Sequence, residues 1–177
     1  MFRKFFVPFL FFCLVSLPYL FAGEAKSIAG ISFQAPDSWK ETEPTSSMRA
    51  FQFEVPGPGD QKGEMAVFYF GAGQGGDLEE NINRWKKQFT KLENENREKK
   101  TVDGLNITEV FLQGSYQLSG GPMMMVQGEP KENYAVLGAI IEAPQGSVFL
   151  KKTGPKDVAA AAKPDFDTLL TNLKKAS

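Results

Sequence analysis

Residues 134–152 read YAVLGAIIEAPQGSVFLKK, and this stretch decides the fold. Residues 134–143 are apolar at odd and even positions alike, which is typical of a central strand with both faces covered. Residues 144–146, Pro-Gln-Gly, predict a turn, and residues 147–152 return as the second strand of a hairpin. Such turns are too short for a parallel crossover, so the sheet is expected to be mainly antiparallel.

Three further strands are predicted before this hairpin, at residues 30–39, 48–55 and 64–70. The first has Ile31 and Phe33 on one face and ends in a proline turn. The third is apolar on both faces, so a central position is expected for it as well.

A helix is predicted after the glycine-rich residues 71–76. Asp77 is a good N-cap, and Glu80 three positions later completes a capping-box pattern. The apolar stripe that follows has helical spacing and comprises Leu78, Ile82, Trp85, Phe89 and Leu92. The charged residues 93–100 are interpreted as a solvated helix end and loop.

The remaining elements complete an α+β domain. Asp103-Gly104 predicts a hairpin between residues 101–102 and 105–113. A polar loop is expected at residues 114–133, a short helix at 158–162 and a terminal helix at 165–175. Helices between and after groups of strands predict a mainly antiparallel sheet flanked by helices, an αβα sandwich formed by one domain over residues 24–177.

Residues 1–23 are interpreted as a secretory signal peptide, with a basic start, an apolar run over 5–21 and a small-residue exit. Cleavage is expected after residue 22, 23 or 25. An uncleaved anchor is the alternative, but Pro8 and Pro18 interrupt the run. We therefore expect a periplasmic or secreted protein without a stable membrane anchor after cleavage.

The composition removes several kinds of chemistry. The chain has no histidine, and its one cysteine, Cys13, lies in the predicted leader. Triads that need histidine and cysteine-based metal sites are therefore excluded, and no cofactor is expected. Without Arg3 and Lys4 the net charge falls from −1 to −3, and no basic patch stands out, so nucleic acid is not an expected partner.

Several short sequence segments resemble those of proteins with the Mog1/PsbP-like fold, among them uncharacterised exported bacterial proteins. They are residues 30–39, 69–76, 83–85, 88–89, 137–140 and 149–155, so the resemblance extends over most of residues 28–173. Relatives include a photosystem II extrinsic subunit and a nuclear-transport accessory protein. The resemblance implies a non-enzymatic binding or assembly module, although a fold alone does not fix a function.

Two motifs have both a functional and a purely structural interpretation. Gly71, Gly73 and Gly76 match the spacing of a dinucleotide fingerprint, but the strands beyond them form hairpins instead of a parallel unit, so a tight exit from a central strand is preferred. Met123, Met124 and Met125 are interpreted as a flexible apolar contact surface for a partner protein. A Cu(I) site and ordinary packing are the alternatives for these methionines.

Trp39 could be a ligand platform and Lys151 or Lys152 a catalytic lysine, but a plainer structural role is preferred for each. Trp39 is expected near a surface edge, and the lysines at a solvated strand end. A catalytic lysine would need burial or neighbours that lower its pKa, and the sequence shows neither.

The sequence thus predicts an exported, non-enzymatic binding or assembly module of the bacterial envelope that recognises a protein partner or a small ligand. Residues 114–133 are the expected contact region, since long loops on rigid scaffolds often carry function. A metal-handling or stress-related envelope protein and a carboxylate-dependent enzyme are the alternatives.

Overall fold

The computed structural model describes residues 24–117 and 129–176. The predicted leader, residues 1–23, and the three methionines Met123–Met125 lie outside the described residues. The strands are β1 (Ala25–Ile28), β2 (Ile31–Gln34), β3 (Lys40–Thr42), β4 (Arg49–Pro56), β5 (Lys62–Tyr69), β6 (Phe89–Val102), β7 (Leu105–Tyr116), β8 (Lys131–Ala143), β9 (Gly146–Pro155) and β10 (Lys174–Lys175). The helices are α1 (Leu78–Lys86) and α2 (Lys156–Thr171).

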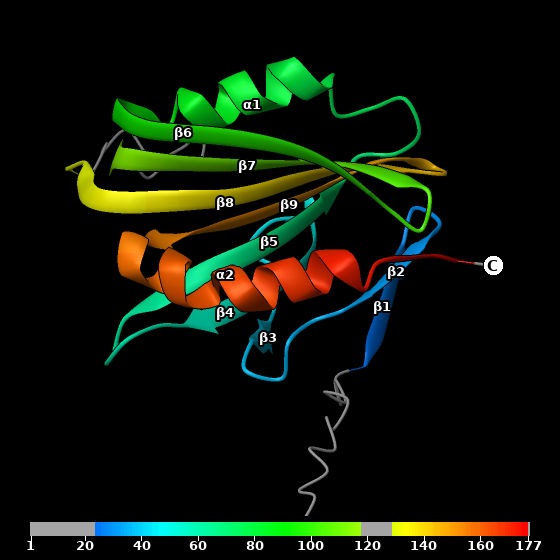
Figure 1. Ribbon diagram of the computed structural model, residues 1–177, viewed down its shortest axis with the longest axis horizontal. Helices are drawn as coiled ribbons and strands as arrows, with labels where there is room; N and C mark the ends of the chain where they lie inside the picture. Colours follow the sequence, from blue (N-terminus) through cyan, green and yellow to red (C-terminus); the bar gives the residue numbers. More distant parts are fainter. Residues whose placement is uncertain (1–23, 118–128, 177) are drawn as a thin grey trace, which may run out of the picture.

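Seven strands form the main sheet, in the order β3-β4-β5-β9-β8-β7-β6, and every neighbouring pair is antiparallel. A small antiparallel sheet, β1-β2-β10, lies beside it (Figure 1). The predicted hairpin over residues 134–152 occupies the middle of the main sheet as β8 and β9. The fold class predicted from the sequence, α+β with a mainly antiparallel sheet flanked by helices, is confirmed.

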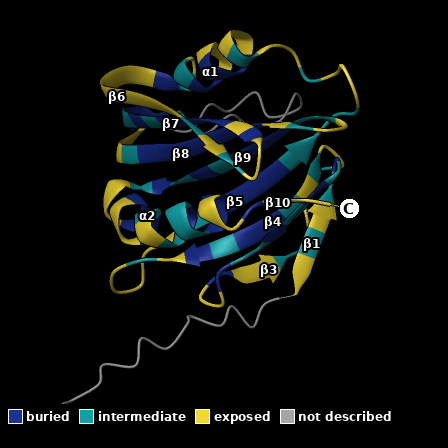
Figure 2. Cartoon of the chain, turned by 45° about the vertical axis from the view of Figure 1, so that its right-hand side comes forward, coloured by how far each residue is buried: buried dark blue, intermediate teal, exposed yellow. Residues whose placement is uncertain are grey.

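The two helices cover opposite faces of the main sheet. On one face α2 buries Val158, Phe166 and Leu169 against a large core that also takes in β2. On the other face α1 buries Ile82 and Trp85 in a smaller cluster with residues of β7, β8 and β9. The central strands are therefore buried on both sides (Figure 2), as the apolar pattern of residues 134–143 predicted.

The helix predicted over residues 78–92 is shorter than expected, and the loop predicted at 93–100 is wrong. The capping box of Asp77 and Glu80 is present, but α1 ends at Lys86 and the chain continues as the 14-residue edge strand β6. The hydrogen bonds that β7 offers along this whole length outweigh the helical spacing of Phe89 and Leu92. Charged side chains on an edge strand also discourage pairing with other chains.

The C-terminal prediction of two helices is also wrong. Residues 156–171 form the single helix α2 with Pro164 inside it. Val158, Ala162 and Phe166 lie on one buried stripe across this proline, and their burial favours a continuous helix. Lys174 and Lys175 leave the helix and pair with β2 as β10.

Two smaller expectations need correction. Trp39 is buried, with 6% of its surface exposed, and packs against Phe53 at 6.4 Å between ring centroids, so it does not lie at a surface edge. The strands take residues from both ends of the loop predicted at residues 114–133, because β7 continues to Tyr116 and β8 begins at Lys131.

Candidate functional site: a cavity beside the end of α1

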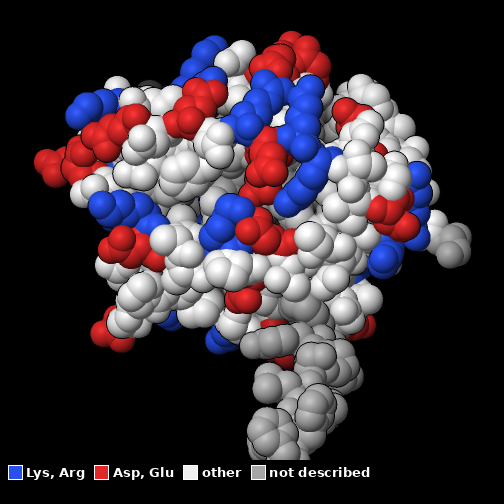
Figure 3. Space-filling view, in the orientation of Figure 1, with Lys and Arg blue, Asp and Glu red and all other residues white. Residues whose placement is uncertain are grey.

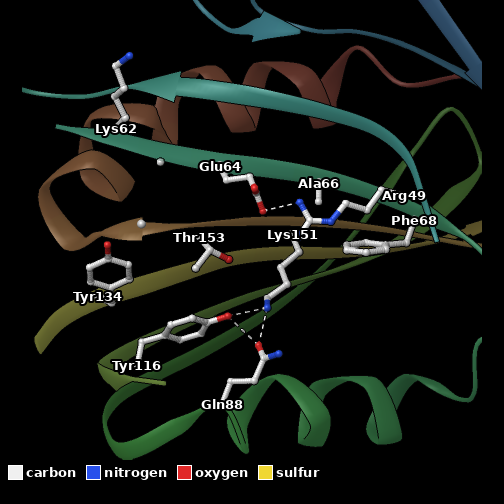
Figure 4. Close-up of a pocket in the computed structure, with 12 residues that line it drawn as sticks. Arg49, Lys62, Glu64, Ala66, Phe68, Gln88, Tyr116, Tyr134, Lys151 and Thr153 are labelled. Atoms are coloured by element: carbon white, nitrogen blue, oxygen red, sulfur yellow. Dashed lines mark hydrogen bonds and ion pairs between the residues drawn. The ribbon is translucent and has the colours of Figure 1, made fainter. Parts of the chain in front are cut away.

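A cavity of about 370 Å³ opens on the sheet face that carries α1. The helix has only nine residues, and among the described residues it leaves the neighbouring part of this face, around Ala66 of β5 and Lys151 of β9, open as this cavity. The cavity is lined by Arg49, Lys62, Gly63, Glu64, Ala66, Phe68, Gln88, Tyr116, Tyr134, Lys151, Thr153 and Gly154 (Figure 4). These residues come from five strands and from the chain just after α1, so a rigid scaffold positions them.

The register of β9 explains why Lys151 points into this cavity. Lys151 lies opposite Ala66 on one side and Gly138 on the other. A Cβ atom at Gly138 would lie 2.2 Å from the ring of Trp85, so the absent side chain lets the indole pack against the sheet. Ala66, on the other side of Lys151, carries only a methyl group. Neither neighbour therefore fills the space above the lysine.

The amine of Lys151 is held by two polar side chains. It donates to the amide oxygen of Gln88 and to the phenol oxygen of Tyr116, the latter at 3.0 Å. The Tyr116 hydroxyl in turn donates to the same Gln88 oxygen at 3.0 Å. Figure 4 shows the lysine side chain reaching from β9 toward this pair. The three groups form a closed polar cluster on the cavity wall.

Aromatic rings fix the position of Tyr116. Its ring meets Phe89 edge-on at 5.1 Å and stacks on Tyr134 at 6.0 Å. Burial raises the pKa of Tyr116 to about 12. The phenol therefore keeps its proton throughout the physiological pH range and remains a hydrogen-bond donor.

Lys151 has an unusual electrostatic environment. Burial lowers its pKa to about 8, the charge of Arg49 acts in the same direction, and that of Glu64 opposes it. No ion pair joins Lys151 to a carboxylate among residues 24–117 and 129–176. A measurable share of this amine is consequently neutral near pH 7.

Arg49 is occupied by other groups. Its guanidinium contacts the Glu64 carboxylate at 2.7 Å, donates to Gln52 at 2.7 Å and lies 5.9 Å from the centre of the Phe68 ring. Glu64 is the one carboxylate among the residues that line the cavity. A convergence of acidic side chains, which the carboxylate-enzyme alternative requires, is not found at this site.

The next lysine, Lys152, points to the opposite face of the same strand. It is fully buried, and its amine has no hydrogen-bond partner among the described residues. Burial lowers its pKa to about 7. The prediction of a solvated strand end for Lys151 and Lys152 is therefore wrong, because β9 continues to Pro155 between two other strands.

The other sequence candidates do not meet at this cavity. Gly71, Gly73 and Gly76 have positive φ angles and carry the chain from β5 into α1, as the preferred interpretation expected. A parallel βαβ unit is missing from the main sheet, so the dinucleotide interpretation is wrong. The partner-contact prediction for Met123, Met124 and Met125 lies outside the described residues and stays a prediction.

The described part of the chain offers neither a metal site nor a membrane-spanning helix. Within residues 24–117 and 129–176, no three histidine, cysteine or acidic residues are grouped so that they could hold a metal ion. Within the same ranges, no helix has the length and apolar character needed to cross a bilayer. Figure 3 shows acidic and basic side chains mixed over one face of the molecule.

No protein-family model matches the chain, and no curated protein matches its sequence. Among solved structures, the chain is similar to the solution structure of the cyanobacterial PsbP protein CyanoP from Synechocystis sp. PCC 6803. The identity is 13% and the TM-score 0.49, over 86% of this chain and 91% of CyanoP. It is also similar to PA94, a Pseudomonas aeruginosa protein of unknown function, with 14% identity and a TM-score of 0.48 over 84% of this chain and 94% of that one. A PsbP protein, from the group that the sequence resembles, is thus among the similar structures, and the likeness concerns the fold alone.

Proposed function

We propose that this chain is an exported, non-enzymatic binding module of the bacterial cell envelope, and that the cavity beside α1 is its ligand site. One observation carries the proposal: the amine of Lys151 lies in a cavity with aromatic walls, oriented by Gln88 and Tyr116, without a carboxylate partner in the described chain. Apolar walls with a few convergent polar groups are typical of small-molecule sites. The ligand is a small molecule, or a protruding group of a partner protein, that offers oxygen atoms to these donors.

Export is supported by the leader-like composition of residues 1–23. It is tested by expressing the full chain in a bacterium with two membranes and sequencing the N-terminus of the protein in the periplasmic fraction. We expect a new terminus just after residue 22, 23 or 25. A cytoplasmic protein that retains Met1 would contradict this part of the proposal.

The ligand site is tested by screening small carboxylates, amides and carbonyl compounds with NMR, using protein exported from cells that express the full chain. Ala66 faces the cavity, so Ala66→Phe should fill the space above Lys151 and abolish binding. Ala160, an exposed residue of α2 on the other face, gives the matched control Ala160→Phe, which should bind as the wild type does. Compounds that bind Ala66→Phe unchanged would place the ligand site elsewhere.

A further inference from the structure

We propose that Lys151 is a nucleophile that captures a small aldehyde or ketone as a reversible imine in the cavity beside α1. The inference rests on the proposed function in one respect, namely that this cavity receives the ligand. It adds the chemical class of the ligand and the covalent bond that retains it. No turnover is implied, because imine formation is reversible.

The geometry meets the needs of a nucleophilic amine. Lys151 is partly buried but lines an open cavity, so a small carbonyl compound can reach its nitrogen. Gln88 and Tyr116 hold that nitrogen at one place on the wall, which removes much of the rotational freedom of a lysine side chain. The short side chain of Ala66, opposite Lys151 on β5, leaves space on the cavity wall next to the lysine stem, through which a small carbonyl compound can approach.

The charges around the amine favour its neutral form. The groups facing Lys151 are the Arg49 guanidinium on β4, the Glu64 carboxylate on β5 and the Tyr116 phenol on β7. Arg49 disfavours a second positive charge, and Glu64 is committed to Arg49 at 2.7 Å. Desolvation and a neighbouring cation are the two means by which lysines that form imines are activated, and the lowered pKa of Lys151, about 8, agrees with both.

Tyr116 is placed to move the proton that the step requires. The neutral amine attacks the carbonyl carbon, a C–N bond forms, and the carbonyl oxygen takes a proton to give a carbinolamine. Loss of that hydroxyl as water, with a proton from the nitrogen, leaves the C=N bond, so the balance is one carbonyl compound and one amine to one imine and one water. The Tyr116 hydroxyl, 3.0 Å from the nitrogen and protonated at neutral pH, can donate to the oxygen and recover a proton from the nitrogen.

Comparing Lys152 with Lys151 separates the effect of solvent access to the amine from the effect of its lowered pKa. Its pKa is lowered at least as far, to about 7, but its amine is fully buried on the other face of β9. It should therefore stay unmodified while Lys151 reacts. The two residues are adjacent in the chain, and fragmentation of one peptide distinguishes them.

The test uses propanal and sodium cyanoborohydride, which reduces an imine to a stable propyl-lysine, with peptide mapping after short exposure at pH 7.5. A pKa of about 8 instead of 10.5 raises the neutral fraction roughly 200-fold. A lower-pKa amine is a weaker nucleophile, and a Brønsted slope of about 0.45, as for thiols, lowers the gain to roughly 20-fold. We expect Lys151 to be modified about 20 times faster than the exposed Lys40. Lys151→Arg should remove this fast reaction. Tyr116→Phe should slow the modification of Lys151 at least tenfold.

The outcomes separate the two proposals. Modification of Lys151 at the rate of Lys40, in protein whose cavity still binds small molecules by NMR, overturns the imine and leaves the ligand site in place. An unchanged rate in Tyr116→Phe overturns the proton-donor role of that residue. Equal modification of Lys152 would overturn the proposal, because an amine buried on the other face would then react as fast as the one in the cavity. If neither propanal nor any screened compound reaches the cavity, the proposed function falls as well.

Discussion

Lys152 allows a quantitative test of the fold, because a buried amine without a partner destabilises the native state in a pH-dependent way. Its pKa falls from 10.5 to about 7 on folding, because burial disfavours the charged form. A difference of about 3.5 pKa units corresponds to roughly 5 kcal/mol, at about 1.4 kcal/mol per unit. Lys152→Met keeps the length and volume of the side chain and removes the charge, so we expect this variant to be more stable than the wild type.

The sign of the pH dependence follows from proton linkage. Between pH 7 and 10.5 the unfolded chain binds a proton at Lys152 that the folded chain does not, so the wild type gains stability as the pH rises. The advantage of Lys152→Met therefore approaches its full value of roughly 5 kcal/mol below pH 7, is about 4 kcal/mol at pH 7 and falls to about 2 kcal/mol at pH 9. Other titrating groups are common to both proteins and cancel in the difference.

The assay is urea denaturation at pH 7 and pH 9, followed by tryptophan fluorescence. Lys40→Met, at an exposed position of β3, is the control and should change the free energy of unfolding by less than about 0.5 kcal/mol at both pH values. An advantage of Lys152→Met that does not shrink at pH 9 would refute the reasoning. A loss of stability at both pH values would show that the amine has a partner that stabilises it.

Three further variants test particular contacts by the same assay. Gly138→Ala places a methyl group 2.2 Å from the Trp85 ring and should destabilise by about 1–3 kcal/mol, with most of the loss absent in a Trp85→Leu background. Asp77→Ala removes the cap of α1 and should lower the free energy of unfolding by about 1 kcal/mol; an unchanged value would mean that packing alone fixes the helix start. Glu109, only 5% exposed, lies between two lysine amines at 2.8 and 3.0 Å, so Glu109→Leu should lower the free energy of unfolding by about 1–3 kcal/mol, and only slightly more at 50 mM than at 1 M salt because salt screens a buried carboxylate weakly. An unchanged free energy of unfolding would contradict a stabilising role for these ion pairs.

The sequence predicted the strands whose apolar pattern reflects their own burial. Residues 48–55, 64–70 and 134–143 fall on β4, β5 and β8, and the turn at Asp103-Gly104 joins β6 to β7 with both residues at positive φ. These features depend on local composition and on alternation of side chains. They could be predicted because each strand carries its own signal of burial.

Elements fixed by a distant partner could not be predicted in this way. The charged residues of β6 have no burial pattern, and it is β7 that makes them a strand. Pro164 marks a break in the local pattern, but the sheet beneath α2 keeps the helix continuous. The cavity beside α1 likewise depends on where the helix ends, on Gln88 and Tyr116 meeting across the sheet, and on the short side chain of Ala66.

The register of the hairpin nevertheless indicates where Lys151 and Lys152 lie in the sheet. With a two-residue turn, Ala143 pairs with Gly146, and each step backward along the first strand fixes a step forward along the second. Since the first strand was apolar as far back as Tyr134, its partner had to continue to Pro155, which places Lys151 opposite Gly138 and Lys152 opposite Leu137, in the interior of the strand and not at its end. Alternation then requires the two lysines to point to opposite faces of the sheet. A lysine pair at the middle of a central hairpin, rather than any recognised motif, was therefore the feature of the sequence that pointed to the cavity.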